Sequence, residues 1–270
     1  MPGTNGVCDQ RIWLVGASQG IGLCLAERLV QAGGRVIASA RGAERSEALR
    51  RLREQDPDRL TLLDIDVTDP PAIEGVCDRA WAAFGGLDVW IYNVGTYEPM
   101  GIEDWDLAEF ERMAQTNYLG AVRLMHALAP RFVKQIGPQD GSRPPSKPAA
   151  QWIWNASLAS DFGLPYGGGY SAPKAALVNL AESLQPELAR HGIALKIINH
   201  GFVKTRLTQK NAFPMLGLME ADEAAERIFA CLGTKRFETR FPRNLATILG
   251  VLKRLPKPWS LALTRGMLKP

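Results

Sequence analysis

Short apolar runs alternate with longer amphipathic stretches along most of the chain, starting at residue 12. Several of these runs are rich in valine, isoleucine, leucine and tryptophan without polar alternation, which is typical of parallel strands buried on both faces. The predicted strands are residues 12–15, 35–39, 60–65, 88–92, 151–156 and 194–199, with a weaker seventh at 236–241.

The stretches between these strands carry apolar residues at helical spacing. The predicted helices are residues 21–32, 43–54, 71–84, 104–135, 170–190 and 221–231. The repeated strand–helix–strand order predicts an α/β fold, a doubly wound parallel sheet of about seven strands flanked by helices. We expect residues 1–242 to form this single domain, because 270 residues leave little room for two full domains.

Two segments interrupt the alternation. Residues 137–150 are rich in proline, glycine and serine, so we expect a surface loop at the amino edge of the sheet, away from any ligand. Residues 243–270 form a tail outside the domain. In the tail, leucine and isoleucine recur at helical spacing from residue 245 until the prolines at 256 and 258.

The charge of the tail differs from that of the rest of the chain. The net charge is +4, which is too small to indicate a nucleic-acid partner. No acidic residue follows Glu238, whereas seven basic residues do: Arg240, Arg243, Lys253, Arg254, Lys257, Arg265 and Lys269. Three interpretations stay open: the tail closes the pocket, packs on a neighbouring subunit, or lies on an anionic membrane as a peripheral contact.

The cysteines and the N-terminus indicate a cytoplasmic protein. Cys8, Cys24, Cys77 and Cys231 are widely separated and form no C-x-x-C motif, so we expect free thiols and no bound metal. The first residues show neither a basic stretch nor an apolar one of the secretory kind. No apolar run approaches the ~20 residues that a membrane span needs.

A glycine-rich loop follows the first predicted strand and leads into a helix. Glycines here let the backbone approach a pyrophosphate, which then faces the positive end of that helix. The strand–loop–helix context favours this interpretation over a mere tight turn. The residues expected to contact the cofactor are Gly16, Ser18, Gln19, Gly20, Ile21 and Gly22.

The end of the second strand bears on the choice between NADP and NAD. In a dinucleotide-binding fold a carboxylate there binds the ribose hydroxyl of NAD, whereas an arginine accommodates the 2′-phosphate of NADP. The chain has Arg41 at this place and no acidic residue before Glu44. This favours NADP(H), through charge-assisted hydrogen bonds. NAD(H) is the alternative, with Arg41 a solvated loop residue, and Gln19 supplies no second positive charge.

The ends of the third and fourth strands complete the cofactor side. Asp66, beside Val67, is placed to accept a hydrogen bond from the adenine amino group, or else to cap the segment after it. Asn93 and Gly95 are expected where the backbone passes close to the ribose.

Tyr170 and Lys174 are four residues apart on a predicted helix, which puts them on one face. A tyrosine has an ordinary pKa of about 10, and a nearby ammonium lowers it. Such a pair can give a proton to a carbonyl oxygen as hydride reaches its carbon, or take one in reverse.

Taken in order, these motifs resemble the short-chain dehydrogenase/reductase family, in its single-domain branch with a Rossmann-type fold. The resemblance covers about residues 11–241 and includes the thirteen-residue interval from Ser157 to Tyr170. The matching residues are Gly16, Gly20, Gly22, Asp66, Asn93, Gly95, Asn117, Ser157, Tyr170 and Lys174.

The resemblance implies a role for each catalytic candidate. Tyr170 is the acid–base, and Lys174 holds the nicotinamide ribose and tunes Tyr170. Ser157 hydrogen-bonds the substrate oxygen, and Asn117 positions a water that links Lys174 to solvent. As alternatives, Ser157 caps a strand end and Asn117 caps or kinks its helix. Ser160 lies close to Ser157 in the sequence and is a decoy.

The sequence departs from the family pattern near the nicotinamide. Val203 and Thr205 match the residues that bind the nicotinamide amide, but His200 stands where the family usually has proline. His200 is expected either to touch the substrate or to replace the proline with a hydrogen bond to the backbone. Val94 stands where the family usually has alanine.

Apolar residues in the loop before Tyr170 and after the sixth strand are expected to form the substrate wall. With His200, the candidates are Phe162, Leu164, Tyr166, Phe213 and Met215. They favour a hydrophobic small-molecule alcohol or ketone, although such loops also simply pack.

The sequence therefore predicts an NADP(H)-dependent oxidoreductase, a carbonyl reductase or alcohol dehydrogenase, that forms a homodimer or homotetramer by analogy with the family. The alternatives are an NAD-dependent dehydrogenase and a non-catalytic NAD(P)-binding regulatory or scaffold protein. An epimerase or dehydratase on this fold usually carries a larger substrate domain.

Overall fold

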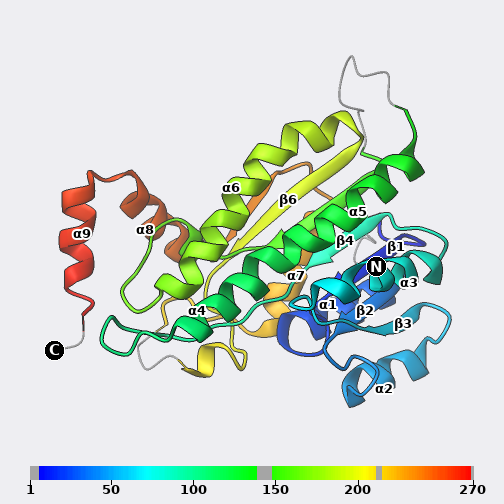
Figure 1. Ribbon diagram of the computed structural model, residues 1–270, viewed down its shortest axis with the longest axis horizontal. Helices are drawn as coiled ribbons and strands as arrows, with labels where there is room; N and C mark the ends of the chain where they lie inside the picture. The colour runs from blue at the N-terminus through cyan, green and yellow to red at the C-terminus, as the bar shows by residue number, and fades with distance from the viewer. Residues whose placement is uncertain (1–5, 139–147, 211–214, 269–270) are drawn as a thin grey trace.

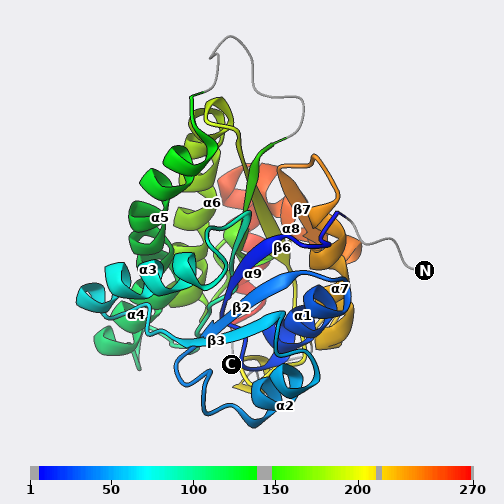
Figure 2. The same ribbon diagram turned by 90° about the vertical axis from the view of Figure 1, so that its right-hand side faces the viewer.

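The computed structural model describes residues 6–138, 148–210 and 215–268. Seven parallel strands form one sheet in the order β3-β2-β1-β4-β5-β6-β7, which confirms the predicted doubly wound fold (Figures 1 and 2). The strands are β1 (Arg11–Val15), β2 (Arg35–Ala40), β3 (Leu60–Asp64), β4 (Val89–Tyr92), β5 (Ala150–Asn155), β6 (Ile193–His200) and β7 (Glu238–Phe241).

Helices cover both faces of the sheet (Figure 2). On one face lie α1 (Gly20–Gln31), α2 (Glu47–Gln55) and α7 (Ala221–Leu232), which share one apolar core with the sheet. On the other lie α3 (Ile73–Ala83), α5 (Gly120–Ile136) and α6 (Gly168–Arg190), which share a second core. The remaining helices are α4 (Leu107–Ala114), α8 (Arg243–Arg254) and α9 (Lys257–Arg265).

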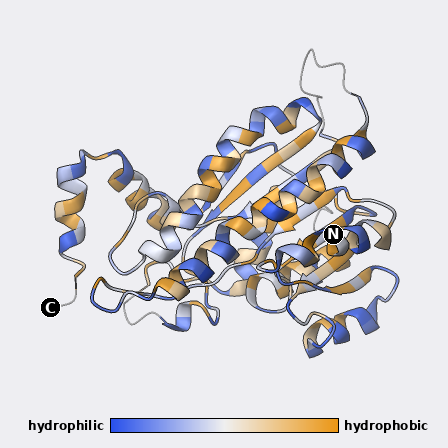
Figure 3. Ribbon diagram, viewed as in Figure 1, coloured by the Kyte–Doolittle hydropathy of each residue, from blue (hydrophilic) through white to orange (hydrophobic). Residues whose placement is uncertain are grey.

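Strands β1 to β6 contribute residues to the apolar cores on both faces of the sheet, and Figure 3 shows hydrophobic residues along the strands in the middle of the molecule. Four tryptophans on the face under α5 and α6 are completely buried: Trp13, Trp90, Trp152 and Trp154. Trp90 packs edge-to-face on Trp152 and Trp154, with ring centroids 5.2 and 5.8 Å away. Rings of this size bury a large area and give β4 and β5 a rigid base for the loops that follow them.

The helix predicted over 104–135 begins at Leu107 and is helical without a break to Ile136, but a π-helical turn interrupts its α-helical winding. The segment consists of α4, a π-helical turn (Gln115–Leu119) and α5. Tyr92 Oη on β4 donates a hydrogen bond to the backbone carbonyl of Thr116 at 2.5 Å. Gly120 packs against the same hydroxyl, because a Cβ there would overlap it. This contact diverts a carbonyl from the helical ladder, which is a recognised cause of a local change in winding.

The tail folds into two helices instead of one. The spacing that predicted a helix after residue 243 is confirmed by α8, whose Leu245 and Leu249 pack on Leu158. Helix α9 was not predicted, because Pro258, which was expected to end the helical pattern, lies in its first turn, where proline is tolerated. Across the described ranges, no helix has the length and apolar content to cross a membrane. Of the predicted loop 137–150, positions 139–147 lie outside the described residues.

Candidate active site

The carboxyl ends of the strands open into a long cavity of about 1120 Å³. Ligands in open α/β sheets bind at this edge, so the cavity lies where a cofactor and substrate were expected. Most of the residues predicted for the site line it: Gly16, Ser18, Gln19, Gly20, Ile21, Arg41, Asp66, Val67, Asn93, Gly95, Ser157, Leu164, Tyr166, Tyr170, Lys174, His200, Val203 and Thr205.

Four predicted residues do not line the cavity. Gly22 packs against the backbone of Gly16 in the glycine loop. Asn117 is completely buried and contacts Thr96 in the loop after β4. Phe162 is buried, with Lys257 Nζ 5.1 Å from its ring centroid, and so belongs to the packing under the tail. Met215 is also absent from the lining. Phe213 lies outside the described residues.

The loop between β1 and α1 has no room for side chains at its glycines. Gly16 has φ +95°, and a Cβ on it would lie 2.9 Å from the backbone of Asn93. A Cβ on Gly22 would overlap the carbonyl oxygen of Gly16. Both positions therefore require glycine, for conformation at Gly16 and for close packing at Gly22.

The amino end of α1 suits an anion. Gln19, which precedes α1, makes no side-chain capping hydrogen bond, and the first turn holds no acidic residue. Gly20 and Ile21 begin the helix and line the cavity. Their amide groups lie at the positive end of the helix dipole, so this cradle fits the diphosphate of a dinucleotide.

Polar residues line the cavity after the ends of β2 and β3. Asp66 Oδ1 accepts hydrogen bonds from the amide and hydroxyl of Thr68 at 2.9 and 2.7 Å, so Asp66 holds a local turn while it lines the cavity. Arg41 is exposed and lines the cavity. Arg45 folds against the nearby Gly42 and does not line the cavity.

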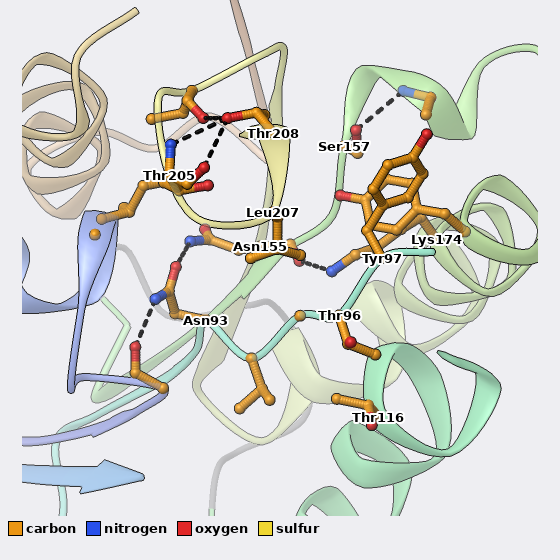
Figure 4. A pocket seen from close by; sticks show the side chains of 18 of the residues that line it. Asn93, Thr96, Tyr97, Thr116, Asn155, Ser157, Lys174, Thr205, Leu207 and Thr208 are labelled. Carbon is orange, nitrogen blue, oxygen red and sulfur yellow. Dashed lines mark hydrogen bonds between the residues drawn. The ribbon is translucent and has the colours of Figure 1, made fainter. Parts of the chain in front are cut away.

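The side chain of Asn93 connects the glycine loop with β5, beyond the expectation that the backbone here only passes close to the ribose. Its Nδ2 donates to the carbonyl of Gly16 at 2.8 Å, and its Oδ1 accepts from Asn155 Nδ2 at 2.5 Å (Figure 4). The end of β4 is thereby tied to the glycine loop on one side and to β5 on the other.

Tyr170 and Lys174 lie on one face of α6 and both line the cavity. Lys174 is 2% exposed, and its Nζ donates to the carbonyl of Asn155 at 2.8 Å (Figure 4). Burial disfavours the ammonium and lowers the pKa of Lys174 to about 7. Nζ lies 5.9 Å from the centroid of the Tyr170 ring.

The pKa of Tyr170 is raised in this structure, to about 12. The dominant cause is burial, and a hydrogen bond with Ser157 opposes it. The ring packs edge-to-face on Tyr97 with centroids 5.4 Å apart. The tuning by Lys174 that the family resemblance implies is thus not the main influence on Tyr170 here, because Lys174 is turned toward Asn155.

Ser157 combines both roles considered for it. Its Oγ accepts a hydrogen bond from the amide of Ala159 at 3.2 Å and so caps the 3-10 turn (Leu158–Ser160) after β5. The same hydroxyl lines the cavity and is hydrogen-bonded with Tyr170. The decoy, Ser160, does not line the cavity; its hydroxyl lies 3.4 Å from Asn199 Oδ1.

The amide of Asn117 makes two hydrogen bonds with the backbone of one residue. Its Oδ1 accepts from the Thr96 amide at 2.8 Å, and its Nδ2 donates to the Thr96 carbonyl at 2.9 Å. Asn117 therefore fixes the loop after β4, which carries Tyr97 against Tyr170. One N–H and one lone pair of this amide are not used by Thr96, and the side chain sits in the π-helical turn, as the alternative of a kinked helix anticipated.

His200 takes the backbone-bonded arrangement. Its Nδ1 pairs with the carbonyl of Gly201 at 2.8 Å, and burial lowers its pKa to about 4, so the ring is neutral. The ring stacks on Phe241 with centroids 6.3 Å apart. It also lines the cavity, so a contact with substrate stays open.

Several lining residues were not identified from the sequence. Asn155 could have been predicted to line the cavity, because it stands two residues before Ser157. The apolar wall opposite α6 comes from the tail, through Leu245 and Leu249, together with Phe202. No local pattern could reveal that contact, since α8 is about 90 residues beyond Ser157 in the chain. Among the described residues, no group of His, Cys, Asp and Glu could hold a metal ion.

Known proteins resemble the chain over most of its length. Residues 10–214 match the family described as short chain dehydrogenase. An uncharacterized oxidoreductase of Myxococcus xanthus is 31% identical over 245 residues, which cover 91% of this chain and 92% of that one. The 1-deoxy-11-beta-hydroxypentalenate dehydrogenase of Streptomyces avermitilis is 29% identical over 244 residues, covering 88% and 86%.

Solved structures share the fold. A short chain dehydrogenase from Burkholderia cenocepacia, solved in complex with NADP, matches with a TM-score of 0.78 at 22% identity. The match covers 98% of this chain and 99% of that one.

Proposed function

The chain belongs to the short-chain dehydrogenase family, and on this basis we propose that it interconverts an apolar alcohol and the corresponding ketone or aldehyde with NADP(H). Membership makes it an oxidoreductase with a nicotinamide cofactor. The observation that carries the finer proposal is that Tyr170, Ser157 and Lys174 line the same cavity as the glycine loop.

The protein would hold the cofactor along the cavity. The glycine loop and the first amides of α1 bind the diphosphate, while Val203 and Thr205 contact the nicotinamide amide. When bound, the cofactor supplies or accepts the hydride.

Tyr170 moves the proton at the substrate oxygen. In the reducing direction its hydroxyl donates to the carbonyl oxygen, and Ser157 hydrogen-bonds the same oxygen. Lys174 holds the ribose, and when it carries its proton it favours the phenolate of Tyr170. Asn117 binds the backbone N–H and carbonyl of Thr96 and so positions the loop that carries Tyr97.

Arg41 supports NADP over NAD. It is exposed and lines the cavity after the end of β2. An exposed guanidinium group at this place suits the 2′-phosphate.

The apolar wall supports a hydrophobic substrate. Leu164, Phe202, Leu245 and Leu249 line the cavity beyond Tyr170, and α8 closes that side. A non-catalytic NAD(P)-binding protein is disfavoured, because nothing constrains such a protein to keep Tyr170, Ser157 and Lys174 together.

The test is a panel of apolar and polar aldehydes and ketones with NADPH and NADH, followed at the absorbance band of the reduced nicotinamide. We expect turnover of apolar carbonyl compounds with NADPH. No turnover of any of them, despite NADPH binding, would overturn the proposal. The expected homodimer or homotetramer is measured on the same sample by light scattering.

A further inference from the structure

Helix α9 buries polar residues and exposes apolar ones, the reverse of an ordinary surface helix. Its inward-facing residues Ser260 and Thr264 are 0% and 6% exposed, whereas Trp259, Leu261 and Leu263 are 66%, 54% and 62% exposed. A surface helix normally turns its apolar stripe to the core. The apolar side of α9 therefore faces away from the chain that carries it.

The exposed apolar surface continues onto α8. Leu245 and Leu249 pack inward on Leu158, while Ile248 and Val251 are 47% and 52% exposed. We call the following residues the outer face of the tail: Ile248, Val251, Trp259, Leu261, Leu263, Met267 and Leu268. Figures 1 and 3 show α9 at one end of the molecule with apolar bands along it. A patch of this kind on a protein surface marks an interaction site.

The charges around the outer face are all positive. Arg243, Arg254, Lys257 and Arg265 are exposed on the same two helices, and no acidic residue follows Glu238. No ion pair within the described ranges involves these four side chains. Nearby, Arg240 of β7 pairs with Asp161 and Glu238, and Lys253 of α8 pairs with Asp161.

A second exposed apolar patch serves as a contrast. In the segment before α4, Ile102 and Leu107 are 89% and 62% exposed. The neighbouring residues there are Glu103, Asp104 and Asp106. The two patches are alike in exposure and opposite in charge, so a partner selected by charge would distinguish them.

We propose that the outer face of the tail docks on an anionic lipid surface. Lysine and arginine side chains next to buried apolar residues can reach the headgroups, and tryptophan favours the boundary between headgroups and acyl chains. A two-fold contact with a second copy would bring the same patch to both sides and set cations against cations. The negative headgroups neutralise these charges while the acyl region takes up the apolar side chains. The proposal concerns docking alone and does not depend on the proposed reaction.

The experiment is flotation of the full-length protein with large unilamellar vesicles. One set is pure phosphatidylcholine, and the other contains phosphatidylglycerol as the anionic component. We expect binding to the anionic vesicles that weakens as salt is raised and is much weaker on phosphatidylcholine. Binding to neither vesicle, or equal binding to both, overturns the proposal.

Variants locate the contact. The triple variant Trp259→Ser, Leu261→Ser, Leu263→Ser removes exposed apolar groups and should abolish binding to anionic vesicles. The double variant Arg254→Gln, Arg265→Gln should weaken binding roughly 30-fold, from about fivefold per removed charge. The matched control is Ile102→Ser, Leu107→Ser on the acidic patch, which should bind like the parent.

Fold and self-association are followed in parallel. Each variant is compared with the parent by thermal unfolding and by light scattering, because a folded variant is required for interpretation. A parent that ignores vesicles but forms an oligomer that the triple variant loses would make the outer face a self-interface and refute the lipid proposal. Equal loss of vesicle binding in the Ile102→Ser, Leu107→Ser control would also refute it.

Discussion

The ammonium of Lys174 donates a 2.8 Å hydrogen bond to the backbone carbonyl of Asn155, the last residue of β5. Through its side chain, Asn155 also binds Asn93 at the end of β4. Asn155, which accepts the hydrogen bond from Lys174, therefore also helps to hold Asn93 against the glycine loop. One backbone carbonyl faces a fully enclosed lysine, and this arrangement makes the charge of Lys174 sensitive to pH.

Lys174 should make the stability of the cofactor-free protein rise with pH. Burial lowers its pKa from 10.5 to about 7, so the unfolded chain binds this proton more tightly than the folded protein. The free energy of unfolding therefore increases between about pH 7 and pH 10.5, in the range where only the unfolded chain holds the proton. Lys174→Met removes this contribution. We expect the Tm of the parent minus the Tm of the variant to increase as pH rises.

The matched control for this experiment is Lys235→Met, which changes an exposed lysine. Its Tm should follow the parent across the same pH range. Parallel curves for the parent and Lys174→Met would mean that Lys174 keeps its charge at neutral pH, held by the carbonyl of Asn155.

Tyr170→Phe should lower kcat by about 10²–10⁴-fold, because it removes the proton donor at the substrate oxygen. NADPH binding, measured by fluorescence titration, should stay within a few-fold of the parent. Tyr118→Phe, away from the cavity lining, is the control and should turn over like the parent. A Tyr170→Phe variant with undiminished kcat would remove Tyr170 from the acid–base role.

Arg41→Gln should raise the KM for NADPH roughly 10- to 100-fold, the range expected for a lost charge-assisted hydrogen bond to phosphate. The KM for NADH should change little, since NADH has no 2′-phosphate. Steady-state kinetics with both cofactors measure this, with the exposed Arg53→Gln as control. If both cofactors lose affinity equally, Arg41 contacts a part that they share. Faster turnover of the parent with NADH would overturn the preference itself.

Asp161→Asn should destabilise the protein and loosen α8. Asp161 is 3% exposed and pairs with Arg240, at 3.1 Å between Oδ1 and Nη1, and with Lys253 at 3.5 Å. Removing the carboxylate takes away the partner that Arg240 and Lys253 share, while Arg240 keeps its pair with Glu238. Because the two cations are partly exposed, at 27% and 55%, we expect a loss of about 2 kcal/mol in unfolding free energy, within the range for hydrogen bonds to a charged group. Urea unfolding measures it.

The control for Asp161 is an exposed ion pair. Glu223 and Arg227 are 47% and 45% exposed and pair within α7, so Glu223→Gln should cost less than about 1 kcal/mol. Equal effects of the two substitutions would show that the Asp161 pair does not anchor α8.

Local chemistry was enough to predict the sheet and the cofactor loop. Runs without polar alternation identified several of the first six strands, because burial on both faces leaves few polar positions, whereas the weaker seventh became β7, which is polar and partly exposed. Positive φ at Gly16 and the i, i+4 placement of Tyr170 and Lys174 are properties of short segments. They depend on local backbone geometry, which neighbouring residues in the sequence determine.

The sequence by itself determined the strands, the order of the elements and the shared face of Tyr170 and Lys174. The tertiary structure decided which partner each side chain meets. It turned Lys174 to Asn155, committed Asn117 to the backbone of Thr96, and brought Leu249 of the tail into the cavity wall. Hydrophobic periodicity specifies which side of a segment is buried. The atoms that lie against that side come from distant segments, and only the packing of the sheet and its helices brings them there.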